Sequence, residues 1–93
     1  MSLQTLFKQS YEERIFQFDF AALMASGATL SSVVSVVSDG AGLTISSAGV
    51  SGTICQALFA AGNTGTTYKI TAKVIDSDGQ KLELDGNLRV QDV

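Results

Sequence analysis

"GTTYKITAKVIDSDGQKLEL", residues 65–84, has the pattern of two β-strands joined by a tight turn. Apolar and polar side chains alternate on both sides of Asp76-Ser-Asp-Gly79, and period two is the signature of a strand with one buried face. Asp, Ser and Gly at the centre favour a hairpin turn in which Gly takes a positive φ. The end of the chain therefore predicts a β-hairpin with arms at 67–76 and 80–91.

The remainder of the chain carries further segments of the same kind. We predict strands and turns from alternation, β-branched residues and Gly/Ser clusters: strands at 13–20, 29–37, 42–47 and 53–60, a turn at 48–52, and a helical turn or compact loop at 21–27 that closes one end of the core. No long amphipathic segment separates the strands, which argues against a parallel βαβ sheet. The predicted fold is an all-β, immunoglobulin-like or fibronectin-III-like antiparallel β-sandwich of six to seven strands.

The alternation also assigns side chains to faces. The predicted core is Phe16, Phe18, Phe20, Leu43, Ile45, Phe59, Tyr68, Ile70, Val74, Leu82 and Leu84. In the 29–37 segment, Leu30, Val34 and Val36 fall on the inward face, and Val33 and Val37 fall on the outward face. Apolar residues on both faces indicate partial cover on each side, or an interface.

Length and composition limit the alternatives. Ninety-three residues favour a single domain over 1–93, in which the aperiodic residues 1–11 form an arm that docks on the body or on a partner. The 45% apolar and 16% charged content excludes a disordered chain, and the apolar runs are too short to cross a membrane. No secretory signal is expected. The net charge of −3 with scattered basic residues argues against nucleic-acid binding.

The sequence offers little catalytic chemistry. It contains no His, and its single cysteine, Cys55, lies in an apolar run typical of a buried thiol. Asp76-x-Asp78-Gly79 resembles part of a calcium loop, but turn chemistry explains it better because the further ligands of such a loop are missing. Glu12, Glu13 and Asp19 fit a solvated strand entrance better than a catalytic pair. We expect no enzyme, no metal and no cofactor.

Tyr68 is the most informative single residue. It starts the penultimate strand directly after a turn, as does the tyrosine corner of immunoglobulin-like sandwiches. Its ring is expected to fill the end of the core, and its hydroxyl to cap a backbone group of the preceding loop. The alternative is a tyrosine that stacks on a ligand.

The chain also shows two family resemblances. Residues 65–80 resemble the penultimate strand and final turn of fibronectin-III-like and PKD-like modules. Nearly the whole chain resembles small tailed-bacteriophage virion proteins of the fibre–tail adaptor type and related phage Ig-like proteins. The matching positions are Asp19, Phe20 and Leu23, then Gly42, Leu43, Thr44 and Ile45, then Gly62, Gly65, Thr67, Tyr68, Ile70, Thr71 and Gly79. Leu58 and Ala61 stand where Trp and Gly are often found in that family.

The second resemblance implies a non-enzymatic structural component of a phage or prophage. It would join tail or head–tail parts by contacts with other virion proteins, as a homo-oligomer that follows the symmetry of the particle, without nucleic-acid or membrane partners. It would be found in the virion, and in the host cytoplasm during assembly. The candidate interface residues are Leu6, Phe7, Tyr11, Val33 and Val37.

Two alternatives stay open at this point. One is a ligand- or carbohydrate-binding Ig-like module of a bacterial surface protein, which would need exposed aromatic platforms. The other is an Ig-like domain cut from a larger adhesin.

Overall fold

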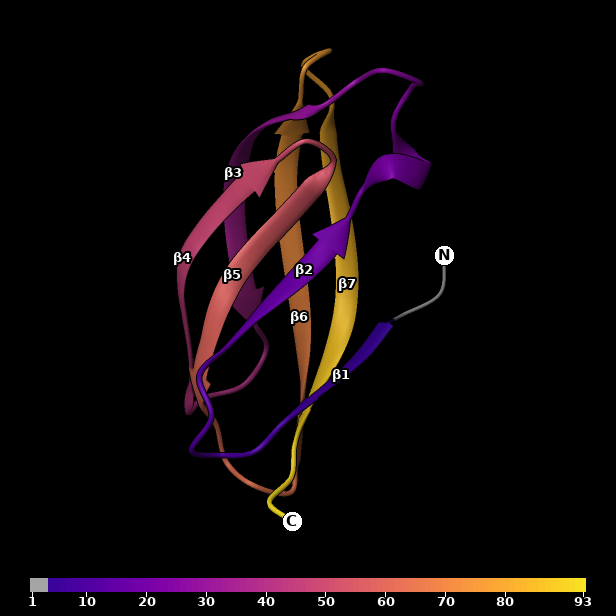
Figure 1. Ribbon diagram of the computed structural model, residues 1–93. Coiled ribbons are helices and arrows are strands. Elements are labelled where there is room, and N and C mark those ends of the chain that lie inside the picture. The colour runs from indigo at the N-terminus through magenta and orange to yellow at the C-terminus, as the bar shows by residue number, and fades with distance from the viewer. Residues whose placement is uncertain (1–3) are drawn as a thin grey trace.

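Seven strands and one 3-10 helix build the protein, as the computed structural model describes for residues 4–93 (Figure 1). In chain order they are β1 (Gln4–Lys8), β2 (Arg14–Asp19), η1 (Ala21–Leu23), β3 (Leu30–Ser38), β4 (Leu43–Ser51), β5 (Ile54–Ala61), β6 (Thr66–Asp76) and β7 (Lys81–Val90). The first three residues of the predicted arm lie outside the described part of the chain. The predicted all-β fold class is confirmed.

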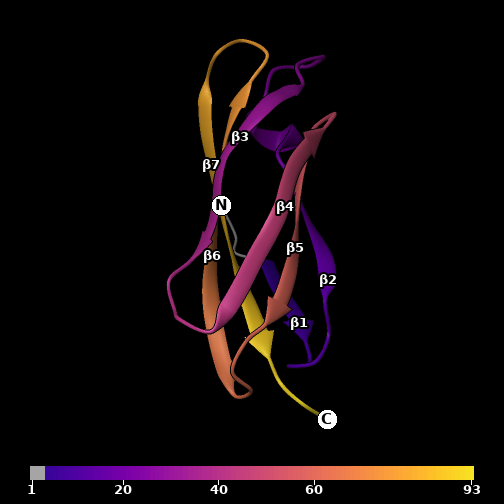
Figure 2. The ribbon, with the colours of Figure 1, turned by 90° about the vertical axis from the view of Figure 1, so that its left-hand side faces the viewer.

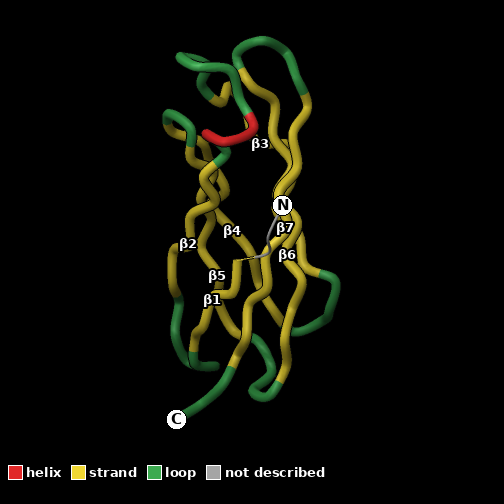
Figure 3. The backbone as a smooth tube through the Cα atoms, turned by 90° about the vertical axis from the view of Figure 1, so that its right-hand side faces the viewer, coloured by secondary structure: helices red, strands yellow, loops and turns green. Residues whose placement is uncertain are grey.

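The strands form two sheets that face each other, as the two edge-on views show (Figures 2 and 3). One has the order β1-β7-β6-β3 and the other β2-β5-β4. When the strands are lettered A to G in chain order, the second sheet is B-E-D and three strands of the first are G-F-C. These are the neighbours that an immunoglobulin-type sandwich pairs.

The first strand departs from the predicted antiparallel arrangement. β1 pairs in parallel with β7, with Leu6 opposite Leu88, so the four-stranded sheet is mixed. The residues of the arm that β1 contains therefore dock on the body. Without β1, the edge of β7 would present unpaired backbone N–H and C=O groups. Pairing with β1 satisfies them.

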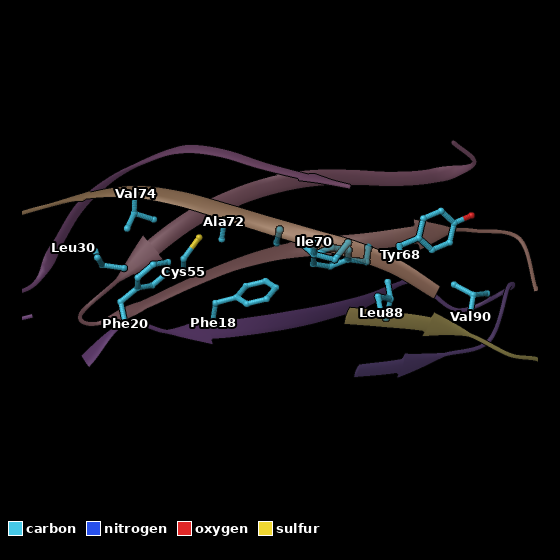
Figure 4. Close-up of a cluster of buried hydrophobic side chains, with 12 residues drawn as sticks. Phe18, Phe20, Leu30, Cys55, Tyr68, Ile70, Ala72, Val74, Leu88 and Val90 are labelled. Carbon is cyan, nitrogen blue, oxygen red and sulfur yellow. The ribbon is translucent and has the colours of Figure 1, made fainter. Parts of the chain in front are cut away.

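Twelve apolar side chains between the sheets form the buried core (Figure 4). Of the predicted core residues, Phe18, Phe20, Phe59, Tyr68, Ile70 and Val74 are buried, and Phe16, Leu43, Ile45, Leu82 and Leu84 are partly buried against them. Leu23 and Met24, from η1 and the residue after it, also pack on the core, which confirms that this segment closes one end. The Phe59 ring lies 5.6 Å from that of Phe16, within the range of favourable aromatic pairs.

The predicted face assignment of β3 is wrong for Val33 and Val34, although Leu30 and Val36 face the core and Val37 is exposed as predicted. The pairing of β3 with β6 shifts between Leu30 and Ser32 and again between Val33 and Ser35, so the strand contains two irregularities of the β-bulge type. Each extra residue reverses the alternation. Val33 therefore packs against the core instead of facing outward, whereas Val34, predicted inward, is 58% exposed.

The predicted turn at 48–52 is also wrong in position. β4 continues to Ser51, and the chain reverses at Gly52, which has a φ of 59°. The Gly and Ser residues of this segment instead accommodate a register shift between Ser46 and Gly49, next to Ser47 with a φ of 54°. A bulge therefore stands where the composition predicted a turn.

The turn between β6 and β7 has the chemistry that the sequence predicts. One carboxylate oxygen of Asp76 accepts hydrogen bonds from the backbone N–H groups of Asp78, at 3.0 Å, and Gln80, at 2.8 Å. Gly79 has a φ of 81°. The Asp76 side chain thus holds the hairpin turn together, an arrangement typical of Asx turns.

Tyr68 ties together two loops at one end of the sandwich. Its ring is buried, and its hydroxyl accepts a hydrogen bond from the Asn63 N–H at 2.9 Å and donates one to the Ala41 carbonyl at 3.0 Å. Asn63 precedes β6, whereas Ala41 lies between β3 and β4. The hydroxyl therefore bonds to the loop before its own strand, as the sequence predicts, and also to a second loop.

We expect Tyr68→Phe to lower the free energy of unfolding by about 1–3 kcal/mol, because the Asn63 N–H and the Ala41 carbonyl lose their partner while the ring stays in place. Urea unfolding followed by circular dichroism measures the change. Tyr11→Phe is the matched control, because Tyr11 is 96% exposed. Equal stability of the two variants would contradict the role of the hydroxyl.

Candidate functional site

The structure separates the five predicted interface residues into three groups. Phe7 and Tyr11 are 62% and 96% exposed at the β1–β2 end of the molecule. Val37 is 50% exposed on β3, at the opposite edge of the four-stranded sheet. Leu6 and Val33 pack against the core. The predicted residues therefore do not form one continuous surface, and the largest exposed group lies near the N-terminal strand.

The exposed apolar groups near β1 gather at what we call the terminal corner: Phe7, the β1–β2 connection at 9–13, Arg14, and the C-terminal residues 91–93. An open hollow of about 400 Å³ lies here, lined by Phe7, Lys8, Gln9, Glu12, Arg14, Gln91 and Val93. Its walls combine an aromatic ring, an aliphatic side chain and charges of both signs. This mixture is typical of the surface that one protein presents to another.

A buried lysine fixes the corner from inside. Lys8 is 3% exposed, and its ammonium group donates hydrogen bonds to the carbonyl oxygens of Gln9, at 2.7 Å, and Ala61, at 2.5 Å. Burial lowers the pKa of Lys8, and the attraction of Glu12, Asp92 and Glu13 offsets part of this effect. The ammonium thus links the start of the β1–β2 connection to the end of β5, across the two sheets.

The C-terminus adds a second set of bonds. The Asp92 carboxylate accepts hydrogen bonds from the N–H of Ser10, at 2.8 Å, and from its hydroxyl, at 2.9 Å. These bonds from Ser10 lower the pKa of Asp92. A carboxyl whose pKa is lowered by folding stabilises the fold above its unfolded pKa, and this contribution is lost as pH falls through the lowered pKa. The corner is therefore held by Asp92 at neutral pH.

Arg14 completes the surface of the corner. Its guanidinium lies 5.5 Å from the centre of the Phe16 ring, and one of its nitrogens donates to the Phe7 carbonyl at 3.5 Å. The position over a ring face is typical of a cation–π contact. Arg14 is exposed, so the same guanidinium can still meet an acidic or carbonyl group of a partner.

The structure gives no support to the other chemistries considered from the sequence. Cys55 is buried, and burial raises the pKa of its thiol, which disfavours the nucleophilic thiolate. Over residues 4–93, no three acidic, Cys or His side chains are placed to hold a metal ion. The described chain also contains no helix of the length and apolarity needed to cross a membrane.

Comparison with known families identifies the chain's relatives. The family described as podophage GP4 fiber-tail adaptor protein gp77 matches residues 8–89. The chain belongs to this family. A search of curated proteins found no match. The resemblance to fibre–tail adaptors that the sequence motifs indicated is confirmed, and membership of an adaptor family supports a role as a structural component of a phage tail.

The family match begins at Lys8 and includes most of the terminal corner. Sequence reasoning missed three features that lie within the match. Lys8 is inward because it is in phase with Leu6, although alternation over so short a strand is a weak signal. Val34 is outward because of the bulge in β3. Ile15 is 61% exposed on β2, and it was not among the candidate interface residues.

We expect Lys8→Met to destabilise this member of the adaptor family by about 1–3 kcal/mol, because a methionine fills the space but leaves buried carbonyl oxygens without a donor. The free energy of unfolding in urea measures the effect. Lys81→Met, at an exposed position, is the control and should be neutral. If both variants match the unsubstituted chain, Lys8 does not hold the corner.

Proposed function

We propose that the chain is a non-enzymatic structural component of a phage or prophage virion that joins tail or head–tail parts by protein–protein contacts. The observation that carries this proposal is the match of the fibre–tail adaptor family over residues 8–89. The protein would act in the virion, after assembly in the host cytoplasm. In the particle it would be present in several copies, as the symmetry of a tail requires.

The terminal corner is the proposed contact with another virion protein. Aromatic residues and arginine are enriched in the parts of interfaces that contribute most to affinity, and the corner exposes Phe7, Tyr11 and Arg14. The bonds made by Lys8 and Asp92 hold the corner in one conformation before binding, which reduces the entropy lost on association. Burial of Phe7 alone contributes about 1.5–3 kcal/mol per copy.

The charges of the chain support protein partners over nucleic acid. Lys8 is buried, and Lys69 and Lys73 lie within 3.7 and 4.0 Å of Asp85 and Glu83. These lysines are therefore not part of a free basic stripe of the kind that neutralises several phosphates.

A carbohydrate-binding module receives less support. Tyr68, one of the two tyrosines, is buried with both hydrogen-bonding capacities of its hydroxyl used inside the protein. Tyr11 remains exposed, and it lines a shallow hollow with Glu13. Sugar platforms need flat, accessible aromatic rings, and the terminal corner offers Phe7 on β1 and Tyr11 in the irregular connection after it.

Phe7→Ser combined with Tyr11→Ser is expected to prevent incorporation of the protein into tails. The free energy of unfolding should change by no more than about 0.5 kcal/mol, because both side chains are exposed. Quantitative mass spectrometry of purified particles, complemented in trans, measures incorporation.

Val37→Ser is the control for this experiment, since it removes an exposed apolar side chain at the far edge of the same sheet. Normal incorporation of the Phe7/Tyr11 double variant would overturn the assignment of the corner. A loss with Val37→Ser as well would extend the contact to β3.

A further inference from the structure

The charges of the chain are distributed unevenly between the two sheets. Between Phe20 and Tyr68 the sequence has a single charged residue, Asp39, which lies in the loop after β3. β4 and β5 therefore carry no charge at all. β2 begins at the exposed Arg14, directly after the exposed Glu13. It ends with one outward carboxylate, Asp19, which already accepts hydrogen bonds from the Ala21 N–H and the Thr53 hydroxyl.

The outer face of the β2-β5-β4 sheet, which is turned toward the reader in Figure 1, is consequently almost free of charge; we call it the uncharged face. At its centre, Gln17 donates to the side-chain oxygen of Gln56 at 3.2 Å. Ile15 lies opposite Leu58 in the next row. The outer face of the other sheet is different, since it carries the Lys69–Asp85 and Lys73–Glu83 pairs.

The fold does not require this difference. Outward positions of an antiparallel sheet normally carry polar and charged residues, because they face water and add nothing to the core. A chain that places charges on one outer face and omits them from two whole strands of the other leaves the second face suited to contact with protein.

The uncharged face also has a knob and a hollow side by side. Ile15 projects from β2 with 61% of its surface exposed. Next to it, the register shift beside Ser47 opens a hollow of about 210 Å³, lined by Ile15, Ser47, Gln56, Ala57 and Leu58. A face that carries both features is complementary to itself under a two-fold rotation, because each copy can place its isoleucine at the hollow of the other.

We propose that two copies of the chain pair through their uncharged faces about a two-fold axis near Gln56. In such a contact every residue near the axis meets its own copy, so a charged residue there would face a like charge. Each copy has a net charge of −3, so two copies repel each other. Contact through the uncharged face brings no like charges together near the axis.

Two other arrangements fit the face less well. Pairing through the open edges of β3 and β4, the flank toward the reader in Figure 2, is hindered because both strands contain bulges. A sugar ligand is disfavoured because the aromatic rings of β2 and β5 point inward, at Phe16, Phe18 and Phe59. The pairing is separate from the terminal corner and does not depend on the adaptor role.

The experiment is sedimentation velocity of the purified chain at concentrations up to about 1 mM, since a face three strands wide is smaller than a standard interface of roughly 800 Å² per partner and gives weak association. Gln56→Glu and Gln56→Lys are tested alone and as an equimolar mixture. The glutamate retains the oxygen that accepts the Gln17 hydrogen bond. Ile15→Glu, at an exposed position, repeats the test should either Gln56 variant fail to fold. Asn87→Asp, an equivalent amide-to-carboxylate change on the other sheet, is the control.

We expect the unsubstituted chain to form a dimer with increasing concentration. Each Gln56 variant, and Ile15→Glu, should weaken association at least about tenfold, the mixture of the two Gln56 variants should restore it, and Asn87→Asp should leave it unchanged. A chain that stays monomeric throughout the concentration range overturns the proposal. So does a dimer that the Gln56 and Ile15 variants leave intact, because its contact then lies elsewhere.

Discussion

The hydroxyl of Tyr68 joins two loops by hydrogen bonds, and the structure of one end of the sandwich depends on these bonds. It bonds to Asn63 and Ala41, in two loops that connect strands of different sheets. Gly42 is part of the same arrangement, because a Cβ on it would lie 2.8 Å from the Asn63 side chain and its φ is 98°. These contacts fix how the two sheets meet, and they explain why the Gly and Tyr positions of the family pattern concern the scaffold. The residues that recognise partners are to be sought elsewhere.

At the same end of the sandwich, short polar contacts hold the exposed residues of the terminal corner in place. Lys8 donates to carbonyl oxygens of Gln9, in the β1–β2 connection, and Ala61, at the end of β5. Asp92 accepts hydrogen bonds from Ser10, so the connection is fixed although it is exposed. Rigid presentation of Phe7 and Tyr11 suits a protein that joins other proteins, since little conformational entropy remains to be lost on binding. The same sandwich keeps its charges on one outer face and leaves the other uncharged. The fold thus offers two chemically different surfaces for an assembly.

Strands and core were predictable where alternation is regular, and errors arose where it is not. In β6, Tyr68, Ile70 and Val74 keep period two and are buried as predicted. In β3 the inward residues Leu30, Val33 and Val36 are three apart, and only two bulges make that spacing compatible with a strand. Alternation cannot show this because Ser and Val fit either face. Of the candidate interface residues in the aperiodic first segment, Phe7 and Tyr11 are exposed whereas Leu6 packs on the core, and the sequence pattern does not distinguish them. Burial of Lys8 depends on partners distant in sequence, such as Ala61.

Hydroxyl-radical footprinting of the protein in intact tails and as the free chain shows whether the terminal corner contacts another virion protein. Aromatic side chains react readily when exposed, and Phe7 and Tyr11 are exposed in the free chain. Their oxidation is expected to fall sharply in the tail, while the oxidation of Lys81 and Glu83, which are exposed on the other sheet, stays the same. Equal oxidation of Phe7 and Tyr11 in tails and in the free chain would contradict this contact.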